Sequence, residues 1–61
     1  MKIKEMRESK GMTQFELSVC LNVCRSSVAM WETGQSTPRP EVLIKLSELF
    51  NCTVDELLKG E

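Results

Sequence analysis

The sequence predicts an all-α fold, a compact domain of five short helices. Apolar residues recur at spacings of three and four, as on one face of a helix, and no stretch alternates as a strand would. Two Thr-x-x-Glu patterns mark helix starts, and the short linkers favour a compact bundle. Glycine or proline separates most of the helical stretches, at Gly11, Gly34, Pro38, Pro40 and Gly60.

The length of 61 residues allows one domain, residues 1–61, and a domain this short buries only about 60% of its unfolded surface. An apolar content of 41% is ordinary for a globular protein. No apolar run approaches the roughly 20 residues that span a bilayer, and the first ten residues lack the apolar core of a signal peptide. We therefore expect a cytoplasmic protein with no membrane contact.

The predicted helices cover residues 2–10, 13–21, 24–32, 40–50 and 53–59. Ile3 and Met6 lie on one face of the first helix, and Gly11 follows as its terminator. Leu17 and Leu21 form an apolar pair four residues apart on the second. The apolar stripe of the third helix consists of Val23, Val28 and Trp31. That of the fourth consists of Leu43, Leu46 and Phe50.

Three helix starts are marked by their first residues. Thr13 precedes Glu16 by three positions, and Thr53 precedes Glu56 by the same spacing, so both pairs can form a capping box. Pro40 suits the first turn of the fourth helix, where its missing N–H has no partner to lose.

The cysteines and the missing histidine argue against a metal or cofactor site. Cys20, Cys24 and Cys52 are odd in number, fit no disulfide framework, and are too few for a four-ligand zinc site. We expect reduced thiols and no cofactor, and a redox response through Cys20 and Cys24 stays open. The chain has no histidine or tyrosine and no nucleophile paired with a base, so we do not expect an enzyme.

The second and third predicted helices are joined by only about three residues, Asn22 to Cys24. So short a connection forces a large crossing angle, which is the helix-turn-helix geometry. With the apolar stripe of the third helix in the core, Arg25 and Ser26 face outward near its start. Arginine can bond a guanine edge in a bidentate way, and serine can bond bases or phosphates. The alternative is a merely solvated helix face, and these residue types alone do not decide between the two.

Residues 3–58 resemble the lambda-repressor/Cro-type helix-turn-helix family, the XRE or Cro/C1-type class, in order and spacing. The matching features are Arg7, Gly11, Thr13-Gln14, Leu17, Leu21, Val23, Trp31-Glu32, Gly34, Pro38 and Asp55-Glu56-Leu57-Leu58. The resemblance implies a DNA-binding transcriptional regulator whose third helix enters the major groove of double-stranded DNA.

The resemblance also implies roles for individual positions. Base reading falls to Arg25, Ser26, Ser27 and Met30. Contacts to the DNA backbone fall to Thr13, Gln14, Thr33, Gln35, Ser36, Thr37 and Arg39. Arg7 and Glu32 correspond to a partly buried ion pair that fastens the first helix to the third.

Several residues depart from the family pattern. Ser18 replaces a small alanine, and Asn22 replaces the turn glycine, a change that asparagine tolerates at modest cost. Cys24 replaces a serine or threonine at the N-cap of the third helix, where a thiol is a weaker acceptor. Val19 and Cys20 replace charged residues, which leaves an exposed apolar pair.

The formal net charge of -1 is unevenly distributed. Residues 1–40 hold six basic and four acidic residues, a net of +2, whereas residues 41–61 hold two basic and five acidic residues, a net of -3. Affinity for DNA depends on the charges close to the phosphates and not on the net charge of the chain, so we expect residues 1–40 to bind DNA weakly. Specific binding then needs a second copy of the domain on the same site. The expected dimer surface is Ile44, Leu49, Val54 and Leu58, and ordinary core packing is the alternative for each.

We therefore expect a repressor that binds a near-palindromic operator as a homodimer, without a small-molecule ligand. The alternative is an antitoxin or phage-type regulator that acts mainly through a protein partner.

Overall fold

The computed structural model describes residues 1–59 and contains five helices, with no strand in that range. The helices are α1 (Ile3–Ser9), α2 (Gln14–Leu21), α3 (Arg25–Thr33), α4 (Pro40–Leu49) and α5 (Val54–Leu58). Each begins and ends within one residue of the range expected from the sequence. The all-α fold, with α2 and α3 as its helix-turn-helix, is confirmed.

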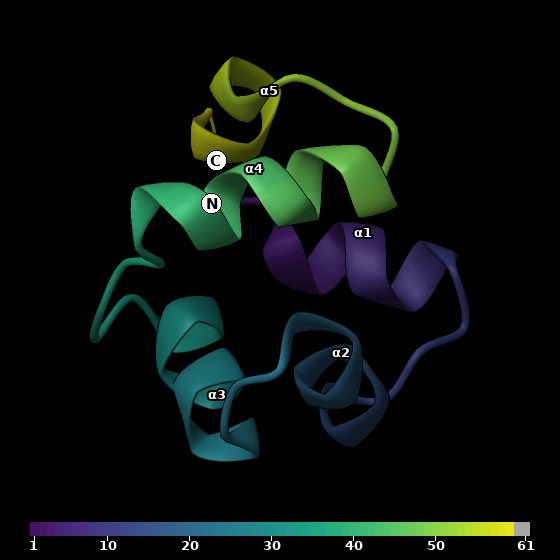
Figure 1. The fold of residues 1–61 in the computed structure, drawn as a ribbon, viewed down its shortest axis with the longest axis vertical. Coiled ribbons are helices and arrows are strands. Elements are labelled where there is room, and N and C mark those ends of the chain that lie inside the picture. Colours follow the sequence, from purple (N-terminus) through teal and green to yellow (C-terminus); the bar gives the residue numbers. More distant parts are fainter. Residues whose placement is uncertain (60–61) are drawn as a thin grey trace.

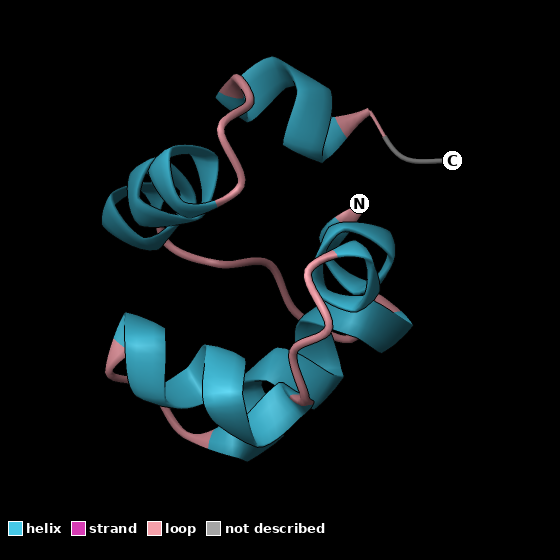
Figure 2. Ribbon diagram, turned by 90° about the vertical axis from the view of Figure 1, so that its right-hand side faces the viewer, coloured by secondary structure: helices cyan, strands magenta, loops and turns pink. Residues whose placement is uncertain are grey.

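The helices stack in three levels (Figure 1). The short helix α5 lies at one end, α4 and α1 cross the middle, and α2 and α3 form the other end (Figures 1 and 2). Within this stack α2 contacts α3 and α4, α3 contacts α1, and α4 contacts α5. The helix-turn-helix therefore has one outer face, with the other helices packed behind it.

All five helices contribute to one apolar core. Its buried members are Ile3, Leu17, Leu21, Val28, Trp31, Leu46, Phe50 and Leu57. Val23 and Leu43 were also expected in the core, but they are only half-buried and pack against its edge. No helix could bury its apolar face alone, so the position of α3 depends on the helices behind it.

The capping boxes of α2 and α5 both form as the sequence predicts. The main-chain N–H of Glu16 donates to the Thr13 hydroxyl at 3.0 Å, and the N–H of Thr13 donates to the Glu16 carboxylate at 2.8 Å. The same exchange joins Thr53 and Glu56 at 3.1 and 2.9 Å. These bonds satisfy main-chain donors that have no partner inside the helix.

The turn between α2 and α3 depends on Asn22, which takes a left-handed conformation with φ of 59°. In this conformation the N–H of Val23 reaches back to the Ser18 carbonyl at 3.0 Å and closes the end of α2. Asparagine is among the few non-glycine residues that adopt this conformation readily, so the expectation for this position is confirmed. Gly34, with φ of 84°, ends α3 in the same way.

None of the five helices in residues 1–59 combines the length and the apolar content needed to cross a membrane.

Candidate functional site

Helix α3 has one buried face and one face open to solvent. Val28 is fully buried and Trp31 is 7% exposed, so this side is fixed in the core. Arg25, Ser26 and Met30 are exposed, and Ser27 lies half-buried at the flank. The division matches the sequence-based interpretation, in which the exposed residues near the start of α3 are free to contact a ligand.

Cys24 occupies the N-cap of α3 with an extended backbone, but its side chain makes no capping hydrogen bond. Thr13 and Thr53 provide such a bond at the starts of α2 and α5. The thiol is a weak acceptor, so the first turn of α3 lacks a stabilising contact that the other two helices have.

Arg7 of α1 and Glu32 of α3 form the ion pair that the sequence suggested. The Arg7 Nε donates to one Glu32 carboxylate oxygen at 2.7 Å, and Nη2 donates to the other at 3.3 Å. The Arg7 Nη1 also donates to the Met12 carbonyl at 2.7 Å. The side chains are 11% and 4% exposed, so both charges lie largely out of water.

The pair shifts the protonation of both partners. Burial disfavours the ionised form of Glu32, but hydrogen bonds from Arg7 and Gln14, together with the positive charges of Arg7 and Lys4, outweigh it, and the pKa of Glu32 falls below its ordinary 4.5. The hydrogen bond to Glu32 raises the pKa of Arg7. The pair is therefore fully ionised near neutral pH.

Gln14, the first residue of α2, connects this ion pair to the start of α3. Its Nε2 donates to the Glu32 carboxylate at 3.0 Å, and its Oε1 accepts from the Arg25 Nη1 at 3.2 Å. No sequence pattern indicates this connection, because the partners lie 18 and 11 positions away and the resemblance assigned Gln14 to the DNA backbone.

The other residues expected at the DNA backbone lie around the start of α2 and the loop between α3 and α4. Thr13 uses its hydroxyl in the capping box, and the Thr33 hydroxyl donates to the Ala29 and Met30 carbonyls, both at 3.2 Å. Gln35 and Thr37 are exposed. The half-buried Ser36 and the exposed Arg39 complete the set.

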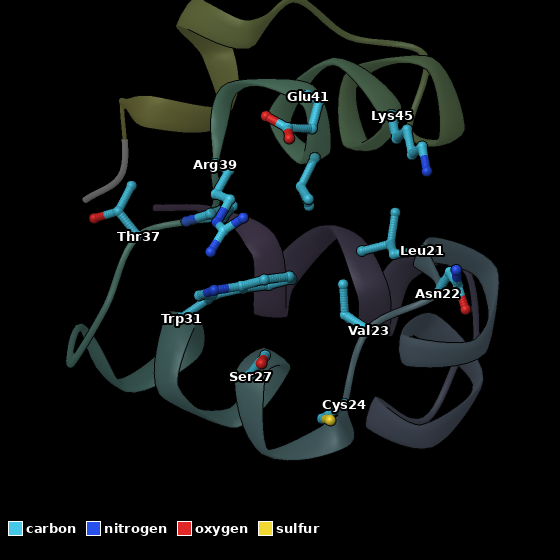
Figure 3. A pocket seen from close by; sticks show the side chains of 12 residues that line it. Leu21, Asn22, Val23, Cys24, Ser27, Trp31, Thr37, Arg39, Glu41 and Lys45 are labelled. Atoms are coloured by element: carbon cyan, nitrogen blue, oxygen red, sulfur yellow. The ribbon is translucent and has the colours of Figure 1, made fainter.

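A cleft of about 450 Å³ lies between α3, the α2–α3 turn and the start of α4. Figure 3 shows Arg39 pointing toward Trp31 at one side of this cleft, and Lys45 at the other. No sequence pattern identifies Lys45, because α4 comes to lie beside the α2–α3 turn only in the folded chain. Glu41 also lines the cleft and partly offsets these cations.

Exposed apolar residues also lie on α2, α4 and α5. Ile44 is 53% and Leu58 is 48% exposed, whereas Leu49 and Val54, the other residues expected at a dimer surface, are half-buried. Val19 and Cys20 of α2 were expected as an exposed apolar pair, and both are exposed, Val19 by 63%. Phe15, also on α2, is 63% exposed.

Within residues 1–59 no group of three His, Cys, Asp or Glu side chains is placed to hold a metal ion. Cys20 and Cys24 are exposed free thiols. Burial raises the pKa of the Cys52 thiol, and the nearby Glu56 charge raises it further.

Comparison with known proteins adds independent observations. A family model described as "Helix-turn-helix" matches residues 3–57. The HTH-type transcriptional activator BcrR of Enterococcus faecalis is 40% identical over 98% of this chain, and Repressor protein C2 of Salmonella phage P22 is 30% identical over 98%. This chain spans 29% and 28% of the lengths of those two proteins. An uncharacterized HTH-type transcriptional regulator of Archaeoglobus fulgidus is 32% identical over 92% of this chain, which spans 80% of its length.

Replacing Cys24 with serine is expected to stabilise the protein. A serine hydroxyl at this N-cap can accept the main-chain hydrogen bond that the thiol does not, which adds about 0.5–1 kcal/mol to the free energy of unfolding. Urea denaturation measures this change. Cys24→Ala, which supplies no acceptor, is the matched control, and an equal gain from both variants would exclude the cap as the cause.

The pH dependence of stability tests the state of Glu32. Its pKa is lower in the folded chain than in the unfolded chain, so its stabilising contribution is complete above about pH 4.5 and is lost as the pH falls through the lower, folded value. In Glu32→Gln the free energy of unfolding should depend less steeply on pH below about 4.5. Urea denaturation between about pH 3 and pH 7, with the same stabilising osmolyte in all samples, measures both slopes. The exposed Glu48→Gln is the control and should keep the wild-type slope, and an unchanged slope in Glu32→Gln would contradict the assignment.

Proposed function

The chain belongs to the helix-turn-helix family of transcriptional regulators, and we propose that it acts as a repressor that binds a near-palindromic DNA operator as a homodimer. The resemblance to the XRE class drawn from the sequence is confirmed by the family match over residues 3–57. The proposal locates the protein with the DNA, in the cytoplasm.

The observation that carries the proposal is the exposed start of α3. Arg25 and Ser26 lie in its first turn, while Val28 and Trp31 fix the opposite face in the core. A helix held in this way can enter a major groove and present Arg25 to the O6 and N7 atoms of a guanine. Ser26 and Ser27, in the same turn, and Met30, one turn later, are the further base-reading residues of the proposal.

The flanks of this surface supply groups suited to phosphates. Gln14 begins α2, and the free main-chain N–H groups of a helix start favour an anion. On the other side, Thr37 and Arg39 line the cleft beside α4, together with Lys45 (Figure 3). The net charge of +2 in residues 1–40 supports weak, salt-sensitive attraction to DNA, and base contacts add the specificity.

The size of the domain supports binding by two copies. Its longest extent is 23 Å, whereas successive major-groove half-sites on one face of DNA lie about 34 Å apart. One copy therefore reads one half-site. Ile44 and Leu58 are the most exposed apolar residues of the acidic half, and Leu49 and Val54 lie on the same two helices or at their ends, so we propose this surface for the dimer.

We propose repression as the direction of regulation. A repressor needs only to occupy the operator and so block the polymerase. Of the relatives, C2 is named a repressor and BcrR an activator. A reporter gene placed behind an operator obtained by binding-site selection distinguishes repression from activation. A rise in expression on adding the protein would contradict repression.

Replacing Arg25 with alanine is expected to abolish most of the sequence preference. In a binding-site selection from random duplexes, the wild-type protein should enrich a two-fold symmetric sequence with a guanine in each half. On that duplex Arg25→Ala should weaken binding by roughly 5- to 150-fold per half-site, which corresponds to about 1–3 kcal/mol for a bidentate base contact. Fluorescence anisotropy measures the dissociation constants.

Arg39→Ala is the matched control, because Arg39 is proposed to contact phosphate. It should weaken binding to all duplexes alike and reduce the salt dependence by about one counterion per half-site. Equal losses from Arg25→Ala on the selected duplex and on an unrelated one would contradict the base-reading role.

A further inference from the structure

The cleft between α3, the α2–α3 turn and the start of α4 is a place where the apolar core stays partly open. Val23 and Val42 pack against the core but are only half-buried, and both line the cleft. Figure 3 shows Trp31 and Val23 on one side, with Glu41 and Lys45 of α4 across from them. The volume of about 450 Å³ lies within the range of about 300–1,000 Å³ found for small-molecule pockets. The cleft can therefore hold a small organic molecule against apolar side chains.

The charged side chains of the cleft have no partner of opposite charge. Arg39, Glu41 and Lys45 line it, two basic residues and one acidic. Among residues 1–59 the ion pairs are all made by Arg7, so both cations of the cleft are free to bind an anion. Arg39 points into the cleft toward Trp31 (Figure 3). A guanidinium can bind an acid group through two parallel N–H donors, so the cleft favours a ligand with a negative charge.

We propose that this cleft binds a small organic anion with an aromatic body, a class that includes aromatic carboxylates and sulfonates, and that the bound anion displaces DNA phosphate from Arg39. The aromatic body lies against Val23, Val42 and Trp31, and the acid group accepts hydrogen bonds from Arg39. The displacement rests on the proposed function, in which Arg39 contacts phosphate. Because that contact carries no base preference, the ligand weakens binding to all duplexes alike.

The sequence alone led us to expect no small-molecule ligand, because the residues of the cleft are scattered along the chain. They extend from Leu21 at the end of α2 to Lys45 in α4, and only the folded chain brings them together. The half-buried Val23, which was expected inside the core, is where the cleft exposes an apolar side chain.

A second hollow, of about 490 Å³, lies beside α2 and serves as an internal comparison. Phe15 and Val19, both 63% exposed, line it, and its charged residues are Lys10 and Glu16. One charge of each sign gives no net attraction for an anion. An aromatic molecule can bind here through its apolar surface, but this hollow does not distinguish a charged molecule from an uncharged one.

The test uses two fluorescent probes that differ by one charged group. Anilinonaphthalene sulfonate carries a sulfonate on an aromatic body, and phenylnaphthylamine is the same body without it. Trp31 is the only tryptophan of the chain, so energy transfer from it to either probe measures binding. The sulfonate probe should saturate one site per chain and bind more tightly than the uncharged probe. Equal affinity for the two probes would overturn the proposal.

Three variants locate the bound probe. Arg39→Gln should weaken binding of the sulfonate probe by roughly 3- to 10-fold, as expected for loss of a charge-assisted hydrogen bond, and leave the uncharged probe unchanged. Val42→Ser should weaken binding of both probes by roughly 2- to 5-fold, because apolar contact is lost. Val19→Ser makes the same change in the hollow beside α2 and is the matched control, which should bind both probes as the wild type does. Arg39 is exposed, so its variant keeps the fold, and circular dichroism checks the fold of Val42→Ser. Loss of the sulfonate probe in Val19→Ser, with wild-type binding in Arg39→Gln, would overturn the proposal.

A measurement with DNA separates this proposal from the proposed function. At a saturating concentration, the sulfonate probe should raise the dissociation constant of the wild-type protein for the selected duplex by at least the factor that Arg39→Gln causes. It should change the dissociation constant of Arg39→Gln much less. If the probe binds the cleft and the affinity for DNA stays the same, the displacement from Arg39 is overturned. If the wild-type protein prefers no duplex, the proposed function fails, whereas a preference for the sulfonate probe that Arg39→Gln removes still supports the ligand site.

Discussion

The buried ion pair between Arg7 and Glu32 is the contact on which the rest of the structure depends. It joins α1 to α3 through two hydrogen bonds, and a third ties Arg7 to the main chain at Met12. Removing one partner from such a pair leaves an uncompensated buried charge and costs about 3–5 kcal/mol. The whole stability of a domain this size is of order 3–9 kcal/mol. Losing either partner alone therefore removes much of the margin that keeps the domain folded.

The same contact extends to the surface of α3 that we propose for DNA binding. Glu32 projects from α3, and its carboxylate meets Arg7 on one side and Gln14 on the other. Gln14 in turn accepts from Arg25, so a chain of hydrogen bonds leads from α1 to the outer face of α3. Of the acidic residues after position 40, Asp55 and Glu56 lie on α5, at the opposite end of the stack from α2 and α3 (Figure 1), whereas Glu41 lines the cleft beside Arg39.

The sequence predicted the fold well because its local patterns agree with one another. The capping boxes at Thr13 and Thr53 and the left-handed turn at Asn22 each depend on neighbours within a few positions. The hydrogen bonds of Gln14 escaped prediction, because they depend on how α1, α2 and α3 meet in space. The partial burial of Val23 escaped it too, since periodicity identifies a face but not how far a neighbouring helix covers it.

A double-mutant cycle on the ion pair tests most directly whether the fold depends on it. The free energies of unfolding of Arg7→Met, Glu32→Gln and the double variant are measured by urea denaturation, with a stabilising osmolyte added equally to all samples. Each single variant should lose most of the wild-type stability, and the double variant should lose less than their sum by about 1–3 kcal/mol. Effects that add to within about 0.5 kcal/mol would show that Arg7 and Glu32 act independently, and would contradict the central role of the pair.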